Sequence, residues 1–128
     1  MLKYAEKYSF ENLNLSENIL VKSFCDRNNS CVYIKNEDIS ALICFDAVFD
    51  FSSVPNEFKD ADVIISRNDY PVGIENAGCT LCVINAENNR GIIIQNELEE
   101  LGINCAATGG CGDIIIRAED GNISASRE

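Results

Sequence analysis

Short apolar runs rich in branched side chains recur along the chain, and polar turns separate them. Four of these runs occupy residues 31–34, 41–44, 63–65 and 114–116. Branched side chains fit a pleated, half-buried surface, so the runs predict strands. With their neighbours they predict strands at residues 19–25, 30–35, 39–45, 61–66, 80–85, 103–106 and 113–118, and a short final strand after a turn at residues 119–122.

Two segments have helical patterns instead. Residues 52–58 combine a serine suited to capping with a proline in the first turn, which predicts a short helix. Ile94, Leu98 and Leu101 recur at the spacing of one helical face, and Gly102 stands where a C-cap glycine is expected. The sequence therefore predicts two helices.

The order of elements is a meander of strands followed by alternating strands and helices. We therefore expect an α/β (α+β) fold with a mixed sheet of about six to seven strands and two helices. Residues 1–16 are expected to be an N-terminal tail or linker, and residues 17–128 one domain. Within it, Ile64, Leu98 and Ile115 are predicted to be buried. None of the apolar runs approaches the length of a membrane span.

Charge restricts the partners that the chain can bind. Ten Lys and Arg residues stand against 21 Asp and Glu, which gives a formal net charge of −11. Proteins that bind nucleic acids gain most of their affinity from cations that neutralise phosphates, and the basic residues here form no stripe. We therefore expect neither direct binding of DNA or RNA nor attraction to an anionic membrane.

The seven cysteines are an odd number and lie mostly within apolar runs, which favours free thiols and a reducing environment. Cys79 and Cys82 have CxxC spacing, but residues three apart on a strand point to opposite faces, so we interpret them as small apolar residues of a half-buried strand. Cys105 and Cys111 flank the turn Gly109-Gly110 and are a better candidate for a pair.

Five segments together resemble the C-terminal half of the metallo-β-lactamase-like domain of ComEC-type DNA-uptake proteins. Asn28-Asn29-Ser30 opens a strand, and Asp46 ends the strand that corresponds to the family's LLTGD segment. The remaining three matches correspond to the family segments ADVLKVPHHGS, ENNRYGHPSPEVLERLEELGI and DGDIIIRSDG. They cover residues 61–70, residues 87–91 together with 98–103, and residues 111–121. The resemblance spans most of residues 19–125 and implies a truncated metallo-β-lactamase-like fold.

The histidines that hold zinc in that family are missing, because the chain contains no histidine. The resemblance places Asp46 at a family zinc ligand, whereas the paired histidines correspond to Asn68-Asp69-Tyr70 and another histidine falls near Gly91-Ile92. Hydrolysis at zinc needs neutral imidazoles around the ion. We therefore expect no zinc centre, no cofactor and no working zinc hydrolase.

Other candidate chemistry is weak. Asp46 and Asp69 could form a remnant Mg²⁺ or Mn²⁺ site, although solvated or capping carboxylates are the alternative interpretation. Arg27 beside Cys25 is an isolated cation without the histidine that usually activates a thiol. Residues 108–112 resemble a phosphate loop but lack its Gly-Lys-Ser/Thr ending, so they are interpreted as a hairpin turn.

The half-domain resemblance also suggests an assembly. Residues 63–65 and 114–116 place branched apolar side chains on both faces of the sheet, so one face is expected to lie open. A second copy would cover that face in a homodimer, or the chain would pack against another protein segment. The alternative is that the N-terminal segment, with Tyr4, Tyr8 and Phe10, folds over it.

The expected function is a catalytically inactive structural or interaction module related to competence. The alternative is a divalent-metal hydrolase or nuclease that uses Asp46 and Asp69 and is completed by a partner chain.

Overall fold

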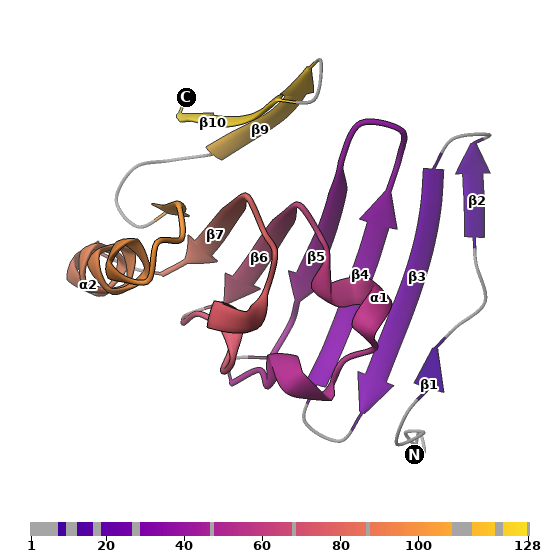
Figure 1. Cartoon of the computed structure of the whole chain (residues 1–128), viewed down its shortest axis with the longest axis horizontal. Coiled ribbons are helices and arrows are strands. Elements are labelled where there is room, and N and C mark those ends of the chain that lie inside the picture. The colour runs from indigo at the N-terminus through magenta and orange to yellow at the C-terminus, as the bar shows by residue number, and fades with distance from the viewer. Residues whose placement is uncertain are drawn as a thin grey trace.

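A computed structural model of the chain describes residues 8–9, 13–16, 19–26, 29–46, 48–67, 69–86, 88–108, 114–119 and 122–127. Figure 1 shows one large sheet, helices against one of its faces and a separate hairpin near the C-terminus. The fold is α+β with a mixed sheet and two helices, which confirms the predicted fold class.

Six strands form the body of the sheet in their sequence order: β3 (Ile19–Asp26), β4 (Asn29–Lys35), β5 (Ser40–Cys44), β6 (Val63–Arg67), β7 (Leu81–Asn85) and β8 (Cys105–Ala107). The short strands β1 (Tyr8–Ser9) and β2 (Leu13–Ser16) pair with the outer edge of β3 and bring the sheet to eight strands. Pairing is antiparallel from β3 to β5 and parallel from β5 to β8. The segment expected to be a tail or linker thus contributes two edge strands.

The connections between the parallel strands contain the helices. The 3₁₀ turn η1 (Phe51–Ser53) and the helix α1 (Asn56–Lys59) join β5 to β6, and the 3₁₀ turn η2 (Ile74–Asn76) joins β6 to β7. Helix α2 (Asn88–Glu100) joins β7 to β8. Because such crossovers are right-handed and the strand order is sequential, the helices lie on one face of the sheet.

The helix predicted over residues 52–58 is wrong in detail, because it is split in two. Asp50 rather than a serine caps the first turn: its side chain accepts a hydrogen bond from the Ser52 N–H, and the Ser52 hydroxyl donates to it as well. These bonds from Ser52 hold the pKa of Asp50 below its usual range. Val54 and Pro55 then have extended backbone, as expected of a residue before proline and of the proline itself.

Helix α2 packs through Ile94 and Leu98, which are buried as predicted. The helix ends in a Schellman motif: Gly102 has φ of 80°, its N–H donates to the Glu99 carbonyl, and the Ile103 N–H donates to the Leu98 carbonyl at 2.9 Å. The chain leaves the helix after Glu100, so Leu101 points away from the core and is 52% exposed. Its predicted place on the buried helical face is therefore wrong.

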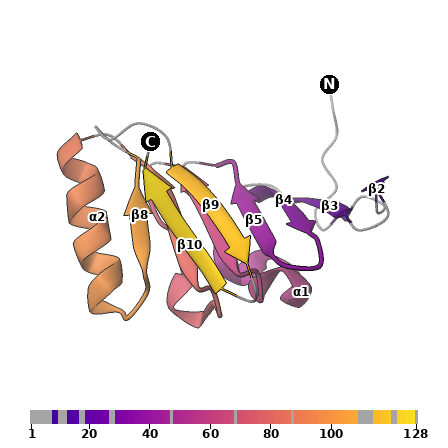
Figure 2. The same ribbon diagram turned by 90° about the horizontal axis from the view of Figure 1, so that it is seen from above.

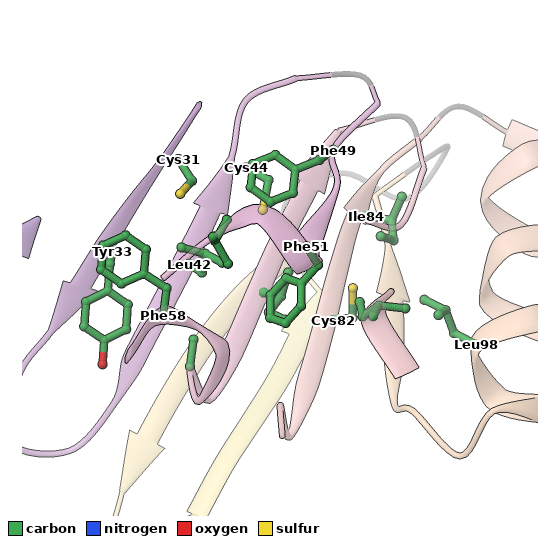
Figure 3. Close-up of a cluster of buried hydrophobic side chains, with 14 of the residues drawn as sticks. Cys31, Tyr33, Leu42, Cys44, Phe49, Phe51, Phe58, Cys82, Ile84 and Leu98 are labelled. Atoms are coloured by element: carbon green, nitrogen blue, oxygen red, sulfur yellow. The ribbon is translucent and has the colours of Figure 1, made fainter. Parts of the chain in front are cut away.

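The larger core lies between the sheet and the helices (Figure 3). Phe58 of α1 has no exposed surface and stacks on Tyr33 of β4 with ring centroids 5.1 Å apart. Phe24 of β3 meets the same ring edge-on at 6.4 Å. Phe49 and Phe51, from the connection after β5, fill the centre of this layer, so aromatic side chains anchor the connection to the sheet.

A hairpin covers part of the opposite face. It consists of β9 (Ile114–Glu119) and β10 (Asn122–Arg127), which pair with each other in a separate two-stranded sheet. Figure 2 shows the hairpin over the half of the sheet formed by β5 to β8. Strand β9 lies nearer to β5 than β10 does. A second, smaller core of Val63, Leu81 and Val83 lies beneath it.

Within β9, alternate residues face that core. Ile114 and Ile116 pack against it, whereas Ile115 is only half-buried and is not part of either core. The prediction that Ile115 is a core residue is wrong, because side chains alternate along a strand and its two neighbours take the inward positions. Ile64, by contrast, is fully buried as predicted.

Candidate functional site

The two carboxylates predicted as a remnant metal site lie at one edge of the sheet. Asp46 follows the end of β5 by two residues, and Asp69 follows the end of β6 by two residues. Because β5 and β6 are parallel neighbours, their carboxyl ends meet at the same edge. The structure thus places both candidate residues at the same end of the two parallel strands.

Each carboxylate nevertheless has a partner of its own. The Asp46 side chain accepts hydrogen bonds from the N–H and, at 3.0 Å, from the hydroxyl of Ser30, which ties the end of β5 to the start of β4. Asp69 accepts a hydrogen bond from the Tyr70 N–H at 2.8 Å and forms an ion pair with Arg90 of α2 at 2.6 Å. Both carboxylates therefore act as connectors between neighbouring segments.

A further contact strengthens the link between Asp69 and α2. The Tyr70 hydroxyl donates to a Glu97 carboxylate oxygen at 2.9 Å. This hydrogen bond raises the pKa of Tyr70 above its ordinary value. Together with the Asp69–Arg90 pair, it holds the segment after β6 against one side of the helix.

No group of three or more Cys, Asp or Glu side chains in the described part of the chain is arranged to hold a metal ion. Two carboxylates with separate protein partners do not by themselves make an oxygen-ligand site, because Mg²⁺ and Mn²⁺ need several oxygen ligands in a defined geometry. The chemistry that Asp46 and Asp69 could perform stays a prediction.

The CxxC pair does not follow the expected geometry. Cys82 belongs to the core on the helix side of the sheet, and Cys79 packs against that same core. The two were expected on opposite faces, which is wrong, because β7 begins only at Leu81 and Cys79 lies in the connection before it. Cys105 is the neighbour of Cys82 across the strand pair and packs against the same core.

These thiols are poorly suited to nucleophilic chemistry. Burial raises the pKa of Cys82 far above its ordinary value and that of Cys105 to about 11. A thiol attacks as its thiolate, so both are inert near neutral pH. The six cysteines within the described residues are free. Cys111, the candidate for a pair with Cys105, lies outside those residues, as does Arg27.

The segment that resembles a phosphate loop is described only at its start. Thr108 donates its N–H to the Ile84 carbonyl at 2.9 Å and its hydroxyl to the Asn85 side chain at 2.9 Å. Residues 109–112 lie outside the described part of the chain. The contacts of Thr108 continue the pairing between β7 and β8.

A small hollow of about 370 Å³ lies between β3 and the α1 connection. It is lined by Phe24, Ser52, Ser53, Val54, Pro55, Asn56 and Lys59. The Lys59 ammonium already donates to the Ser52 carbonyl at 3.4 Å. The hollow therefore offers a shallow, mostly neutral surface.

The most distinctive surface is one that the sequence indicated only in part. Four branched side chains (Val21 of β3, Val32 and Ile34 of β4, and Ile43 of β5) are half-buried, and neither core includes them. We call these four residues the β3–β5 shelf. It lies on the hairpin side of the sheet, since Ile34 pairs with Ala41 and Ile43 with Ile65, and both partners pack beneath the hairpin.

The shelf corrects the predicted position of the open face. We expected residues 63–65 and 114–116 to leave it exposed, but Val63 is completely buried and the hairpin itself supplies Ile114 and Ile116 as its cover. Half-buried apolar side chains that belong to neither core lie instead on β3, β4 and β5. Alternating apolar residues at 19, 21, 32, 34, 41 and 43 were the signal for it in the sequence.

The chain matches no protein-family model, no curated protein and no solved structure. None of its described helices is long and apolar enough to cross a membrane.

Proposed function

We propose that the chain is a catalytically inactive relative of the ComEC-type metallo-β-lactamase-like domain and acts as a structural or interaction module. The β3–β5 shelf is the observation that supports an interaction module, because its half-buried apolar side chains belong to neither core and such side chains favour a protein interface. A link to competence or DNA uptake follows from the resemblance in sequence alone.

The absence of catalysis is supported by the ligands that the sequence lacks. The chain has no histidine, and the carboxylate of Asp46 is bonded to Ser30. A hydrolytic zinc centre needs imidazoles that hold the ion while it acidifies a bound water. Because the imidazoles are absent, we propose that Asp46 and Asp69 keep only the role of connecting neighbouring segments of the fold.

The interaction partner is a second copy of the chain or a segment of another protein. Both would remove the shelf from water, at roughly 25 cal/mol per Å² of apolar surface buried. Direct binding to nucleic acid is disfavoured by the net charge of −11.

One observation favours the alternative function, a hydrolase or nuclease that uses a divalent metal. Asp46 and Asp69 lie at the same carboxyl edge of the parallel strands, so a partner chain could add the missing ligands there. Asp69 would first have to give up its ion pair with Arg90.

A nuclease assay distinguishes the two functions. The full chain, Asp46→Asn, Asp69→Asn and the exposed-carboxylate control Asp60→Asn are incubated with single- and double-stranded DNA and Mn²⁺ or Mg²⁺. The proposal expects no cleavage above buffer from any of the four proteins. Cleavage that Asp60→Asn retains and that both other variants lose would establish the hydrolase instead.

Elemental analysis of the purified protein is the second test. We expect no stoichiometric transition metal after dialysis against a chelator. Near-equimolar zinc that survives this treatment, and that disappears on Cys→Ser substitution, would contradict the proposal that the chain is catalytically inactive.

A further inference from the structure

The shelf has a shape that restricts what can bind to it. Its floor is the face of β3, β4 and β5, and the hairpin rises beside it over β5 to β8 (Figure 2). Stacked sheets lie about 10 Å apart, so the hairpin forms a step of roughly that height. A flat surface as wide as the whole sheet would meet this step before it reached the floor.

The step itself is the edge of a strand. β9 pairs with β10 on one side, and no described strand pairs with its other side. Figure 2 shows that β9 lies on the side of the hairpin nearer to β5, so its unpaired edge is turned toward the shelf. An unpaired edge presents a row of N–H and C=O groups that can accept another strand.

The floor accepts apolar side chains at alternate positions. On this side of the sheet, the alternate positions of β3, β4 and β5 outside the core beneath the hairpin carry no charged side chain; they are Ile19, Val21, Ser23, Cys25, Ser30, Val32, Ile34 and Ile43. Neighbouring strands are about 4.8 Å apart, so the floor has room for only two or three added strands. An occupant that pairs with β9 would place every second side chain on this floor.

Acidic residues lie at both ends of the floor. Glu37 and Asp38 are exposed in the turn between β4 and β5, and Asp46 lies at the opposite end, after β5. A second copy of the chain would bring another net charge of −11 against this surface, whereas a basic partner would be attracted.

We infer that the β3–β5 shelf binds an extended segment of another polypeptide, with alternating apolar residues between basic ends, which adds a strand to the edge of β9 that no described strand occupies. This inference rests on the proposed function as an interaction module and names its partner by chemistry. The floor selects the apolar side chains, the edge of β9 selects the extended backbone, and the acidic ends select lysine or arginine.

The test uses a fluorescein-labelled peptide with a Val-Thr-Val-Thr-Val-Thr core and two lysines at each end. Fluorescence anisotropy with the full chain at low salt is expected to show saturable binding. A peptide with the same core and glutamates at its ends is expected to bind at least about tenfold more weakly. Two further peptides, N-methylated at the odd or at the even core residues, test the backbone contacts, and one of the two is expected to lose binding.

Variants of the protein locate the site. Ile43→Lys should weaken peptide binding at least about tenfold, whereas Val72→Lys should not, because Val72 is 59% exposed and lies outside the shelf. If Ile43→Lys does not fold, Val32→Thr replaces it, because threonine preserves the shape of valine. Val32→Thr should likewise weaken peptide binding relative to Val72→Lys. Absence of saturable binding, equal effects of Ile43→Lys and Val72→Lys, or indifference to both N-methylated peptides would overturn the inference.

Other occupants would be identified by a photo-crosslinker. With p-benzoylphenylalanine in place of Ile34, a crosslink to the added peptide supports the inference. A crosslink to a second copy or to residues 1–7 of the same chain overturns it. If light scattering shows a dimer that Ile43→Lys dissociates, the proposed interaction module would stand, but the inferred partner would be wrong. DNA cleavage that depends on Asp46 would contradict the proposed function as an inactive interaction module, whether or not the peptide binds.

Discussion

Ser40 and Asp62 exchange three hydrogen bonds at the point where the neighbouring parallel strands β5 and β6 begin. The Asp62 carboxylate accepts from the Ser40 N–H at 2.9 Å and from its hydroxyl at 3.2 Å, and the Asp62 N–H donates to the Ser40 hydroxyl oxygen at 3.0 Å. Ser40 is buried, so water is poorly placed to substitute for these bonds. The pair thus fixes how the antiparallel half of the sheet joins the parallel half.

We expect Asp62→Ala to destabilise the fold by about 1–3 kcal/mol, because it leaves a buried N–H and hydroxyl without their acceptor. Urea denaturation followed by circular dichroism measures the change in the free energy of unfolding. Asp60→Ala is the control, since Asp60 is exposed and lies only two residues away. Equal changes in the two variants would show that the Ser40–Asp62 bonds contribute nothing measurable.

Helix α2 offers a matched pair of leucines. Leu98 is completely buried against the sheet, whereas Leu101 is 52% exposed just beyond the helix end. Leu98→Ala should cost about 2–5 kcal/mol through lost contacts and the cavity left behind. Leu101→Ala should change the free energy of unfolding by less than about 0.5 kcal/mol. An unchanged denaturation midpoint for Leu98→Ala would mean that α2 does not pack on the sheet through this face.

Local chemistry explains why the strands could be predicted. Runs such as 63–65 contain consecutive branched residues because β6 is covered on both faces, by the helices and by the hairpin. That composition is visible in any window of sequence. The α2 C-terminus was equally local, because Gly102 adopts the positive φ that a helix C-cap favours.

Features that depend on contacts between distant segments could not be predicted in the same way. That Ile116 packs near Val63 rather than lying on an open face depends on where the hairpin folds back, and no local pattern specifies this. The same holds for the partners of the candidate residues. Ser30 binds Asp46 from 16 residues away and Arg90 binds Asp69 from 21 residues away, so the sequence offered the carboxylates without their contacts.

The buried thiols predict a loss of stability at alkaline pH. Burial raises the pKa of Cys31 to about 12 and that of Cys105 to about 11, and it raises those of Cys44 and Cys82 further. The unfolded chain ionises its thiols near pH 8.5, while the folded protein keeps them protonated. Above that pH the unfolded state therefore binds fewer protons, and the free energy of unfolding decreases as pH rises toward 11–12.

Denaturation midpoints measured from pH 7 to about pH 10.5 in the presence of a reductant test this dependence. We expect the midpoint to fall above about pH 8.5. Cys82→Ala should reduce the slope, because it removes one of the most strongly shifted thiols. Cys25→Ala is the control, since Cys25 is less buried than Cys82. A midpoint that stays constant over this range would contradict the buried, protonated state of these side chains.

The last prediction concerns the way the hairpin faces the sheet. Ile115 and Ile116 are adjacent residues of the same type, but Ile116 packs against the core beneath the hairpin and Ile115 does not. Ile116→Ala should therefore cost about 1–3 kcal/mol more than Ile115→Ala, because only Ile116 leaves unfilled space next to the core. Both variants change the intrinsic strand preference of β9 equally, so the difference isolates packing. Ile123 lies in β10 opposite Ala118 of β9 and packs against the same core. Ile123→Ala should therefore behave like Ile116→Ala. The free energies of unfolding from urea titrations provide the comparison. If Ile115→Ala proved the more damaging of the two, the hairpin would present its other face to the sheet, and the unpaired edge of β9 would no longer border the shelf as inferred above.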